Sequence, residues 1–322
     1  MGEETAKNAP LEAGVRTFVE TVMAESARLS GSGPVSLAES RRIAEIVRTP
    51  WREGGPVMAR TSHHLAGANG HSVRVRVHEP EGAPASNAAL VYLHGGGWTL
   101  FSLDTHDRLM REYAGRSGLT VIGVDYSLSP EARFPVALEE TVGVLAWLVR
   151  EGADLGVDAA RLVIGGDSAG GNLSLAAALK SRDSVQTLPL RGLLLNYGAF
   201  DVEVSDDAAR RLGGPGAMLT ATEMESYWRG YLRGPEDGAD PLAAPLKADL
   251  AGLPPVFLAA AECDLLCEQS VALADRLRQA KVPAELRVYP GAAHSFLEAV
   301  SVSPLADRAL DEAASWLRTI VS

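Results

Sequence analysis

The stretch LVIGGDSAGGNLSLAAALK, residues 162–180, decides the fold. It begins with apolar residues typical of a buried strand, continues with small residues around Ser168, and ends with leucine and alanine at helical spacing. Residues 166–170 match the pattern G-x-S-x-G, in which a serine occupies a sharp turn between a strand and a helix. Glycines are needed beside such a turn because a Cβ atom would clash with the crossing chain. We therefore interpret Ser168 as an exposed nucleophile rather than as a helix-capping serine.

Short apolar runs alternate with amphipathic segments on both sides of this stretch. We expect strands near residues 73–77, 88–93, 120–124, 162–164, 192–195, 256–260 and 286–288. We expect helices near residues 105–117, 135–150, 169–181, 267–280 and 304–320. Strands that alternate with helices predict an α/β fold with a mostly parallel central sheet flanked by helices.

Two regions depart from this alternation. Helical periodicity up to residue 47 predicts two helices joined by a turn, and the region 198–250 contains no clear strand. We therefore divide the chain into an N-terminal helical cap segment (1–55), a first core part (56–197), a cap insertion (198–250) and a second core part (251–322). The aromatic residues around Trp228 either line a pocket or pack the insertion onto the body, and both interpretations stay open.

The partners that would activate the serine follow from chain order. A base must accept the hydroxyl proton and an acid must orient the base, and with this turn the order is serine, acid, histidine. Six of the seven histidines precede Ser168, so His294 is the only candidate base after it. Asp264 ends an apolar strand and is the favoured acid, whereas Glu262 and Glu268 remain alternatives.

A run of three glycines follows the first buried strand, in LHGGGW at residues 93–98. Consecutive glycines let backbone N–H groups converge on one point, and together with the N–H of Ala169 they predict an oxyanion hole. His94 is then a structural residue that holds the loop. A phosphate-binding turn would require an immediate helix N-terminus and usually a lysine, and neither follows here.

Composition argues against several classes of partner. The net charge of −11 disfavours nucleic acid and anionic membranes, and no run of about 18 uncharged apolar residues could span a bilayer. The opening MGEETAKNAP is acidic and polar, unlike a signal peptide, so we expect a cytoplasmic protein. Cys263 and Cys267 are expected to be partly buried thiols, because no histidine lies near them at zinc-ligand spacing. We expect no metal and no organic cofactor.

Several motifs occur together in one order: HGGGW, DYSLSPEARFPVALEE, GDSAGG, ECDLLCE and GAAHSF. From about residue 58 to its end, the chain resembles the bacterial hormone-sensitive-lipase-like carboxylesterases. The resemblance implies an α/β-hydrolase fold with a helical cap built from the N-terminal segment and the insertion. It also implies that Ser168, Asp264 and His294 form a catalytic triad.

The same resemblance implies hydrolysis of small, short-chain acyl esters without a cofactor. It assigns the oxyanion hole to the backbone of Gly96, Gly97 and Ala169. It also suggests which aromatic residues narrow the substrate pocket: Trp98, Tyr197 and Trp228. A homodimer is compatible with the resemblance, and a small-molecule ester is the expected partner.

The chain departs from the family pattern at four positions that leave the predicted triad intact: Ser127, Ser129, Leu265 and Ser295. These departures bear on activity level and substrate range more than on the reaction. An amidase or deacetylase with the same triad is one alternative function. A non-catalytic ligand-binding member of the same fold is a second, and the presence of His294 disfavours it.

Overall fold

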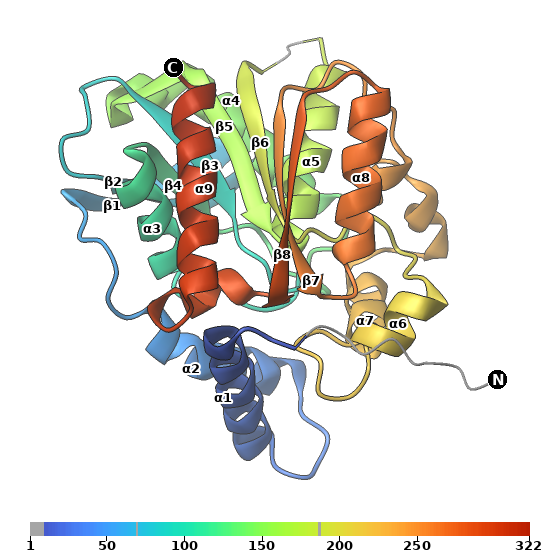
Figure 1. Ribbon diagram of the computed structural model, residues 1–322. Helices are drawn as coiled ribbons and strands as arrows, with labels where there is room; N and C mark the ends of the chain where they lie inside the picture. Colours follow the sequence, from blue (N-terminus) through green and yellow to red (C-terminus); the bar gives the residue numbers. More distant parts are fainter. Residues whose placement is uncertain (1–9, 69, 186–187) are drawn as a thin grey trace.

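A computed structural model describes residues 10–68, 70–185 and 188–322, which fold around an eight-stranded sheet (Figure 1). The strands are β1 (Arg60–Ala68), β2 (His71–Glu79), β3 (Asn87–Leu93), β4 (Thr120–Val124), β5 (Val157–Asp167), β6 (Leu190–Asn196), β7 (Val256–Cys263) and β8 (Ala284–Ala293). Their order across the sheet is β1-β2-β4-β3-β5-β6-β7-β8. β1 and β2 run antiparallel to their neighbours, and the other strands pair in parallel. The mostly parallel sheet predicted from the alternating pattern is confirmed.

Helices cover both faces of this sheet. They are α1 (Ala13–Ser30), α2 (Leu37–Arg52), α3 (Asp107–Ser117), α4 (Val136–Glu151), α5 (Ala169–Arg182), α6 (Asp206–Leu212), α7 (Ala221–Tyr231), α8 (Cys267–Gln279) and α9 (Pro304–Ile320). The shorter 3-10 helices are η1 (Gly152–Leu155), η2 (Pro235–Ala239), η3 (Pro245–Lys247) and η4 (Phe296–Ser301). α3 and α9 pack together on one face, while α4 and α5 pack together on the other face, which α8 also covers. Among the described residues, no helix is both long and apolar enough to cross a membrane.

The central strands are buried on both faces, as their continuous apolar runs require. In β3, Leu90 and Tyr92 belong to the hydrophobic core beneath α3 and α9. Val91 and Leu93 point the opposite way, into the core beneath α4, α5 and α8. Because successive strand residues alternate between faces, one short strand contributes to both cores.

The two regions outside the strand–helix alternation meet at one end of the sheet. α1 and α2 pack on each other and on η4, and α6 and α7 lie at the same end of the molecule (Figure 1). This is the end at which the parallel strands finish, so these helices lie beside the loops where open α/β sheets bind ligands. Their role as a cap stays a prediction.

One strand was missing from the sequence-based expectation. β1 forms the edge of the sheet, and only Ala66 and Ala68 of its residues are fully buried. Its polar residues, such as His63 and His64, weaken the apolar signal that marks the inner strands. β5 also begins at Val157, earlier than expected. Residues 158–161 are partly buried or exposed, so they give no continuous apolar signal in the sequence.

Candidate active site

Ser168 occupies the turn between β5 and α5 with φ 52° and ψ −117°, in the region that favours glycine. A Cβ atom on Gly170 would lie 1.9 Å from the carbonyl oxygen of Leu93, and one on Gly166 would lie 2.2 Å from the same oxygen. Ser168 is at the N-cap position of α5, yet its side chain makes no capping hydrogen bond. The strained backbone therefore presents the hydroxyl away from the helix, and the helix-cap interpretation does not apply.

The predicted acid and base reach this serine from the two strands at the far edge of the sheet. Nε2 of His294, just after β8, lies 3.0 Å from Oγ of Ser168. Nδ1 of the same ring lies 2.7 Å from Oδ2 of Asp264, just after β7. The other carboxylate oxygen of Asp264 accepts the backbone N–H of Leu266 at 3.0 Å, which fixes the carboxylate in place. Three residues far apart in the sequence thus form one hydrogen-bonded chain.

The structure also separates Asp264 from the other candidate acids. The carboxylate of Glu262 accepts the backbone N–H of Gly291 at 3.0 Å. The carboxylate of Glu268 binds the backbone and hydroxyl of Ser205 at 2.8 and 2.6 Å. Neither makes a hydrogen bond to His294, so only the aspartate is placed to orient the imidazole.

The electrostatic surroundings of His294 favour a strong base. Burial by itself lowers the pKa of His294, because it disfavours the imidazolium. The negative charge and hydrogen bond of Asp264 act in the opposite direction and outweigh burial, with smaller contributions from Asp167 and Glu298. The pKa of His294 is therefore raised above its usual value, and the ring has a higher affinity for a proton taken from Ser168.

The glycine loop after β3 offers free backbone donors beside the serine. Gly96 and Gly97 have φ values of 108° and 58°, a conformation that glycine adopts without strain. Within the described part of the chain, the N–H groups of Gly96, Gly97 and Ala169 donate to no protein group. Unsatisfied N–H groups near a nucleophile can stabilise an anion that forms on a substrate oxygen.

A buried carboxylate holds this loop, and the sequence analysis missed it. Oδ1 of Asp167 accepts the hydroxyl of Tyr92 at 2.8 Å and the N–H of Gly95 at 3.2 Å. Its Oδ2 lies 3.3 Å from Nε2 of His106. Burial raises the pKa of Asp167, but the charge and hydrogen bond of His106 outweigh burial and leave the pKa lowered. An acidic residue next to a candidate nucleophile was the available signal.

His94, the first residue of the glycine loop, is arranged as a structural residue. Its ring stacks on Tyr126 with centroids 4.4 Å apart, and its Nδ1 lies 2.7 Å from the carbonyl oxygen of Gly95. Burial, followed by the charge of His106, lowers the pKa of His94 to about 4. The ring is therefore neutral at physiological pH and packs the loop against the core.

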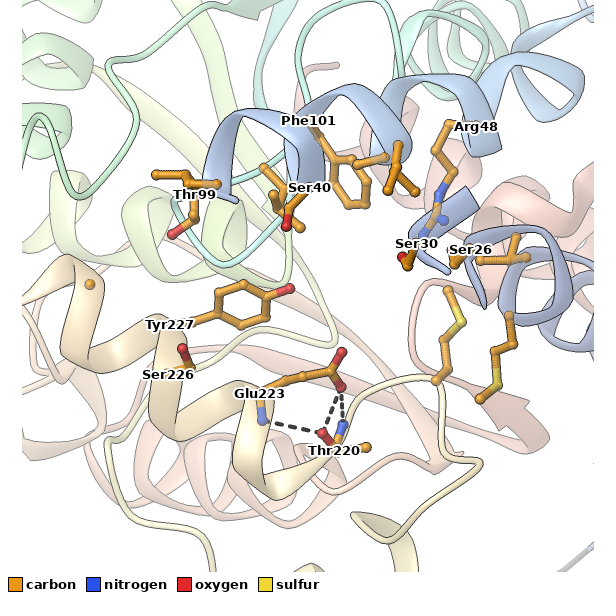
Figure 2. A pocket seen from close by; sticks show the side chains of 18 of the residues that line it. Ser26, Ser30, Ser40, Arg48, Thr99, Phe101, Thr220, Glu223, Ser226 and Tyr227 are labelled. Atoms are coloured by element: carbon orange, nitrogen blue, oxygen red, sulfur yellow. Dashed lines mark hydrogen bonds between the residues drawn. The ribbon is translucent and has the colours of Figure 1, made fainter. Parts of the chain in front are cut away.

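A cleft of about 810 Å³ opens between the N-terminal helices, the loop after the glycines and the insertion (Figure 2). Phe101 and Tyr227 line it, and both also touch the glycine loop. A Cβ atom on Gly97 would lie 2.3 Å from Cγ of Tyr227, and one on Gly96 would lie 2.8 Å from Cδ2 of Phe101. These two aromatic rings therefore border both the cleft and the glycine loop.

The aromatic residues predicted to narrow the pocket do not line this cleft. Trp98 is fully buried, stacks on Tyr231 at 4.3 Å and lies 4.5 Å from Trp228. Tyr197 is also buried and packs edge-on to His294 at 5.2 Å. The two indoles pack on each other and join the insertion to the body, so their role in narrowing a substrate pocket stays a prediction. Trp228 borders a separate cavity of about 690 Å³.

The four departures from the family pattern have identifiable surroundings. The N–H and hydroxyl of Ser127 donate to Glu140 at 2.7 and 2.6 Å, and the hydroxyl of Ser129 donates to a backbone carbonyl at 3.1 Å. Leu265 is fully buried in the core. Ser295 has φ 62° and therefore carries a strained backbone directly after His294.

Metal ligation has no candidate cluster in the described ranges. Over residues 10–68, 70–185 and 188–322, no group of three histidine, cysteine, aspartate or glutamate side chains is arranged to hold a metal ion.

Comparison with known proteins identifies the family. A family model described as the alpha/beta hydrolase fold matches residues 90–298. The chain is similar to a hyperthermophilic esterase from the archaeon Pyrobaculum calidifontis, with 29% identity and a TM-score of 0.89, over 97% of this chain and 99% of that one. It is similar to a thermostable carboxylesterase cloned from a metagenomic library, with 31% identity and a TM-score of 0.85, over 89% of this chain and 98% of that one. It is also similar to a thermostable esterase from Pseudomonas putida, with 27% identity and a TM-score of 0.87, over 100% and 99% of the two chains. The chain therefore belongs to the alpha/beta hydrolase fold family, as an esterase-like member that agrees with its resemblance to the hormone-sensitive-lipase-like carboxylesterases.

Proposed function

We propose that the chain is a serine carboxylesterase that hydrolyses small, short-chain acyl esters through an acyl-enzyme intermediate. The observation that carries this proposal is the hydrogen-bonded chain from Ser168 through His294 to Asp264, with lengths of 3.0 and 2.7 Å. A serine hydroxyl becomes a useful nucleophile only when an adjacent base can take its proton. The esterases to which this chain is similar support the same reaction class.

The proposed reaction has two halves. Oγ of Ser168 attacks the ester carbonyl while Nε2 of His294 takes the hydroxyl proton, and Asp264 stabilises the imidazolium that forms. The tetrahedral intermediate then releases the alcohol, which receives that proton, and leaves the acyl group on Ser168. In the second half His294 takes a proton from water, the resulting hydroxide displaces the acyl group, and Oγ of Ser168 recovers its proton.

The negative oxygen of both tetrahedral intermediates requires stabilisation. We assign this role to the backbone N–H groups of Gly96, Gly97 and Ala169, which are supported as donors by their lack of protein acceptors in the described part of the chain. Loss of one such donor typically costs about 3 kcal/mol of transition-state stabilisation. Asp167 would act indirectly, since its carboxylate holds the N–H of Gly95 at the start of the loop.

Ser168→Ala tests the proposal directly. We expect turnover of p-nitrophenyl acetate to fall by about 10⁴-fold or more, because the nucleophile is lost while the oxyanion donors remain. Ser174→Ala is the matched control, since this serine lies on α5 and its hydroxyl only donates to the carbonyl of Gly170 at 2.7 Å. Substantial turnover by Ser168→Ala, with a circular dichroism spectrum equal to that of the parent, would refute the assignment.

Two further measurements separate the alternative functions. Values of kcat/KM for an ester and its matched amide distinguish a carboxylesterase from an amidase, because acyl transfer to Ser168 is common to both. Covalent labelling of Ser168 by an organophosphate distinguishes an enzyme from a ligand-binding protein, because an unactivated serine does not react.

The cap, the acyl-chain preference, the cellular location and the oligomeric state are also proposals. A cap formed by 1–55 and 198–250 is supported by the position of α1, α2 and α7 around the cleft. A panel of p-nitrophenyl esters from acetate to dodecanoate tests the preference for short acyl chains. A cytoplasmic location and a homodimer stay predictions.

A further inference from the structure

Arg48 places a guanidinium in the wall of the cleft. It lies on α2, its side chain is only 6% exposed, and it lines the cleft into which Figure 2 shows it extending. Among the described residues that line this cleft, Arg48 is the only cation and Glu223 the only acid. A nearly buried charge at the wall of a cavity interacts with a ligand more strongly than an exposed one, because water screens it less.

Most of the donors of this guanidinium are unused. Nε of Arg48 donates to Oε2 of Glu298 at 2.7 Å, a single contact with a side chain that is itself 4% exposed. In the described part of the chain, the two terminal nitrogens of Arg48 make no hydrogen bond to protein, although a guanidinium has five N–H donors. Cζ of the guanidinium lies over the ring of Phe101, 4.8 Å from its centroid, and over the ring of Phe18, 5.5 Å from its centroid. The edge that carries the terminal nitrogens is left without a protein acceptor in the described part of the chain.

The other groups around this edge leave room for a negative partner. Figure 2 shows that the hydroxyl-bearing residues Ser26 and Ser30 border the cleft near Arg48, and hydroxyls can donate further hydrogen bonds to a carboxylate. The carboxylate of Glu223 is turned to its own helix terminus, where it accepts the N–H and hydroxyl of Thr220 at 2.8 and 2.6 Å. Glu298 balances the charge of Arg48, but it uses only the Nε donor.

We propose that Arg48 binds a carboxylate on the substrate, so that the preferred substrates are short-chain esters whose alcohol part carries an acid group. A carboxylate and a guanidinium edge pair through two parallel hydrogen bonds, which match the two terminal nitrogens that are free. A short acyl group leaves the cleft to the alcohol part of the ester. This inference rests on the proposed function for the orientation of the ester, and it adds the chemical class of the alcohol.

The test compares two esters that differ only in charge. We measure kcat/KM for 6-acetoxyhexanoate and for its neutral amide, 6-acetoxyhexanamide, by titrating the acetic acid that is released. The acid should be preferred, and Arg48→Met should lower the ratio of the two values by about 10- to 100-fold, the range expected for a charge-assisted hydrogen-bonded contact. Because the ratio is taken within one protein, a general loss of folded enzyme does not change it. Esters with four and eight carbons in the acid part measure how far the carboxylate must reach.

Two other variants distinguish recognition from a merely structural role. Arg48→Lys keeps the charge but loses the planar pair of donors, so its ratio should lie between those of the parent and Arg48→Met. Arg41→Met is the matched control on the same helix, because Arg41 contacts Thr99, Ser129 and Glu131 and does not line the cleft. Its ratio should stay within about threefold of the parent value. A ratio for Arg48→Met equally close to the parent, or an equal loss in Arg41→Met, would overturn the inference.

A binding measurement separates this inference from the proposed reaction. In the Ser168→Ala enzyme, calorimetry should show that 6-acetoxyhexanoate binds more tightly than the amide, and adding Arg48→Met should remove the difference. Equal binding of the two compounds would overturn the role of Arg48 even if the parent enzyme hydrolyses neutral esters. If the parent hydrolyses neither these two esters nor p-nitrophenyl acetate, the reaction is refuted, and the same comparison of binding in the parent enzyme still decides the role of Arg48.

Discussion

Two buried aspartate–histidine pairs lie near Ser168, and they differ in what the second ring nitrogen contacts. Asp264 holds Nδ1 of His294 and leaves Nε2 directed at the serine hydroxyl. Asp167 lies 3.3 Å from Nε2 of His106, so this ring faces its carboxylate through the opposite nitrogen. The pKa of each histidine is raised, since its carboxylate outweighs the effect of burial. The chemical difference therefore lies in the orientation of the rings.

The remaining nitrogen of His106 has no route to a substrate. Nδ1 lies 2.9 Å from the hydroxyl of Thr105, and the ring is 1% exposed. Its carboxylate partner in turn holds the glycine loop through the N–H of Gly95. We infer that this second pair stabilises the loop, whereas the pair at His294 moves protons.

Substitution of the two histidines should separate catalysis from stability, and it carries the largest expected effect. His294→Gln removes the base and should lower kcat by about 10⁴-fold, because proton transfer then has no acceptor beside Ser168. His106→Gln should lower the free energy of unfolding by about 3–5 kcal/mol, because it leaves the buried carboxylate of Asp167 without its imidazole partner. Steady-state kinetics and urea unfolding of both variants measure the two quantities.

The comparison requires that each substitution affect one property and leave the other nearly unchanged. His294→Gln should retain most of the unfolding free energy, and His106→Gln should retain kcat within about tenfold while it remains folded. If both variants lose activity to the same extent under conditions in which they are folded, the two pairs do not have separate roles.

The contrast also shows what the sequence could establish. Strand, turn and helix around Ser168 are local features, and the position of His294 follows from chain order alone. The sequence favoured Asp264 but left Glu262 and Glu268 open, because all three acids lie at or just after the end of β7 and only the contact with the imidazole separates them. Sequence pattern places a residue on an element, but it does not fix which partner its side chain reaches.

Burial was the other quantity that the sequence did not provide. Trp98 and Trp228 are aromatic residues of the kind that often line pockets, yet their rings pack on each other. Arg48 is a charged residue of the kind expected on the exposed face of an amphipathic helix, yet its side chain is nearly buried beside Glu298. Arg48 on α2 and Glu298 on η4 are 250 residues apart in the sequence, so no local sequence pattern could predict their contact.

The pH dependence of activity sharpens the distinction between the two rings. Since only neutral His294 can accept the proton and its pKa is raised from 6.5, kcat/KM should fall as the pH drops through a midpoint above 6.5. Glu298→Gln removes one of the charges that raise this pKa and should move the midpoint to lower pH. Profiles of kcat/KM from pH 5 to 9 with a neutral ester measure both effects.

The control for this profile uses an exposed charge. Glu20→Gln removes a carboxylate from the surface of α1 and should leave the midpoint unchanged. A rate independent of pH between 5 and 8 would contradict the role of His294 as base.

The smallest expected effect concerns the residue after His294. Ser295 has φ 62° and ψ 15°, a left-handed conformation that costs a residue with a Cβ atom about 1 kcal/mol more than glycine. Ser295→Gly should therefore raise the free energy of unfolding by about 0.5 kcal/mol, because part of the relief is offset by the greater freedom of glycine in the unfolded chain. Ser295→Ala keeps the Cβ atom and removes only the hydroxyl. The difference in unfolding free energy between the two variants therefore measures the effect of the left-handed backbone. If glycine is no more stable than alanine in urea unfolding, the strain beside His294 is not a cost that the folded enzyme carries.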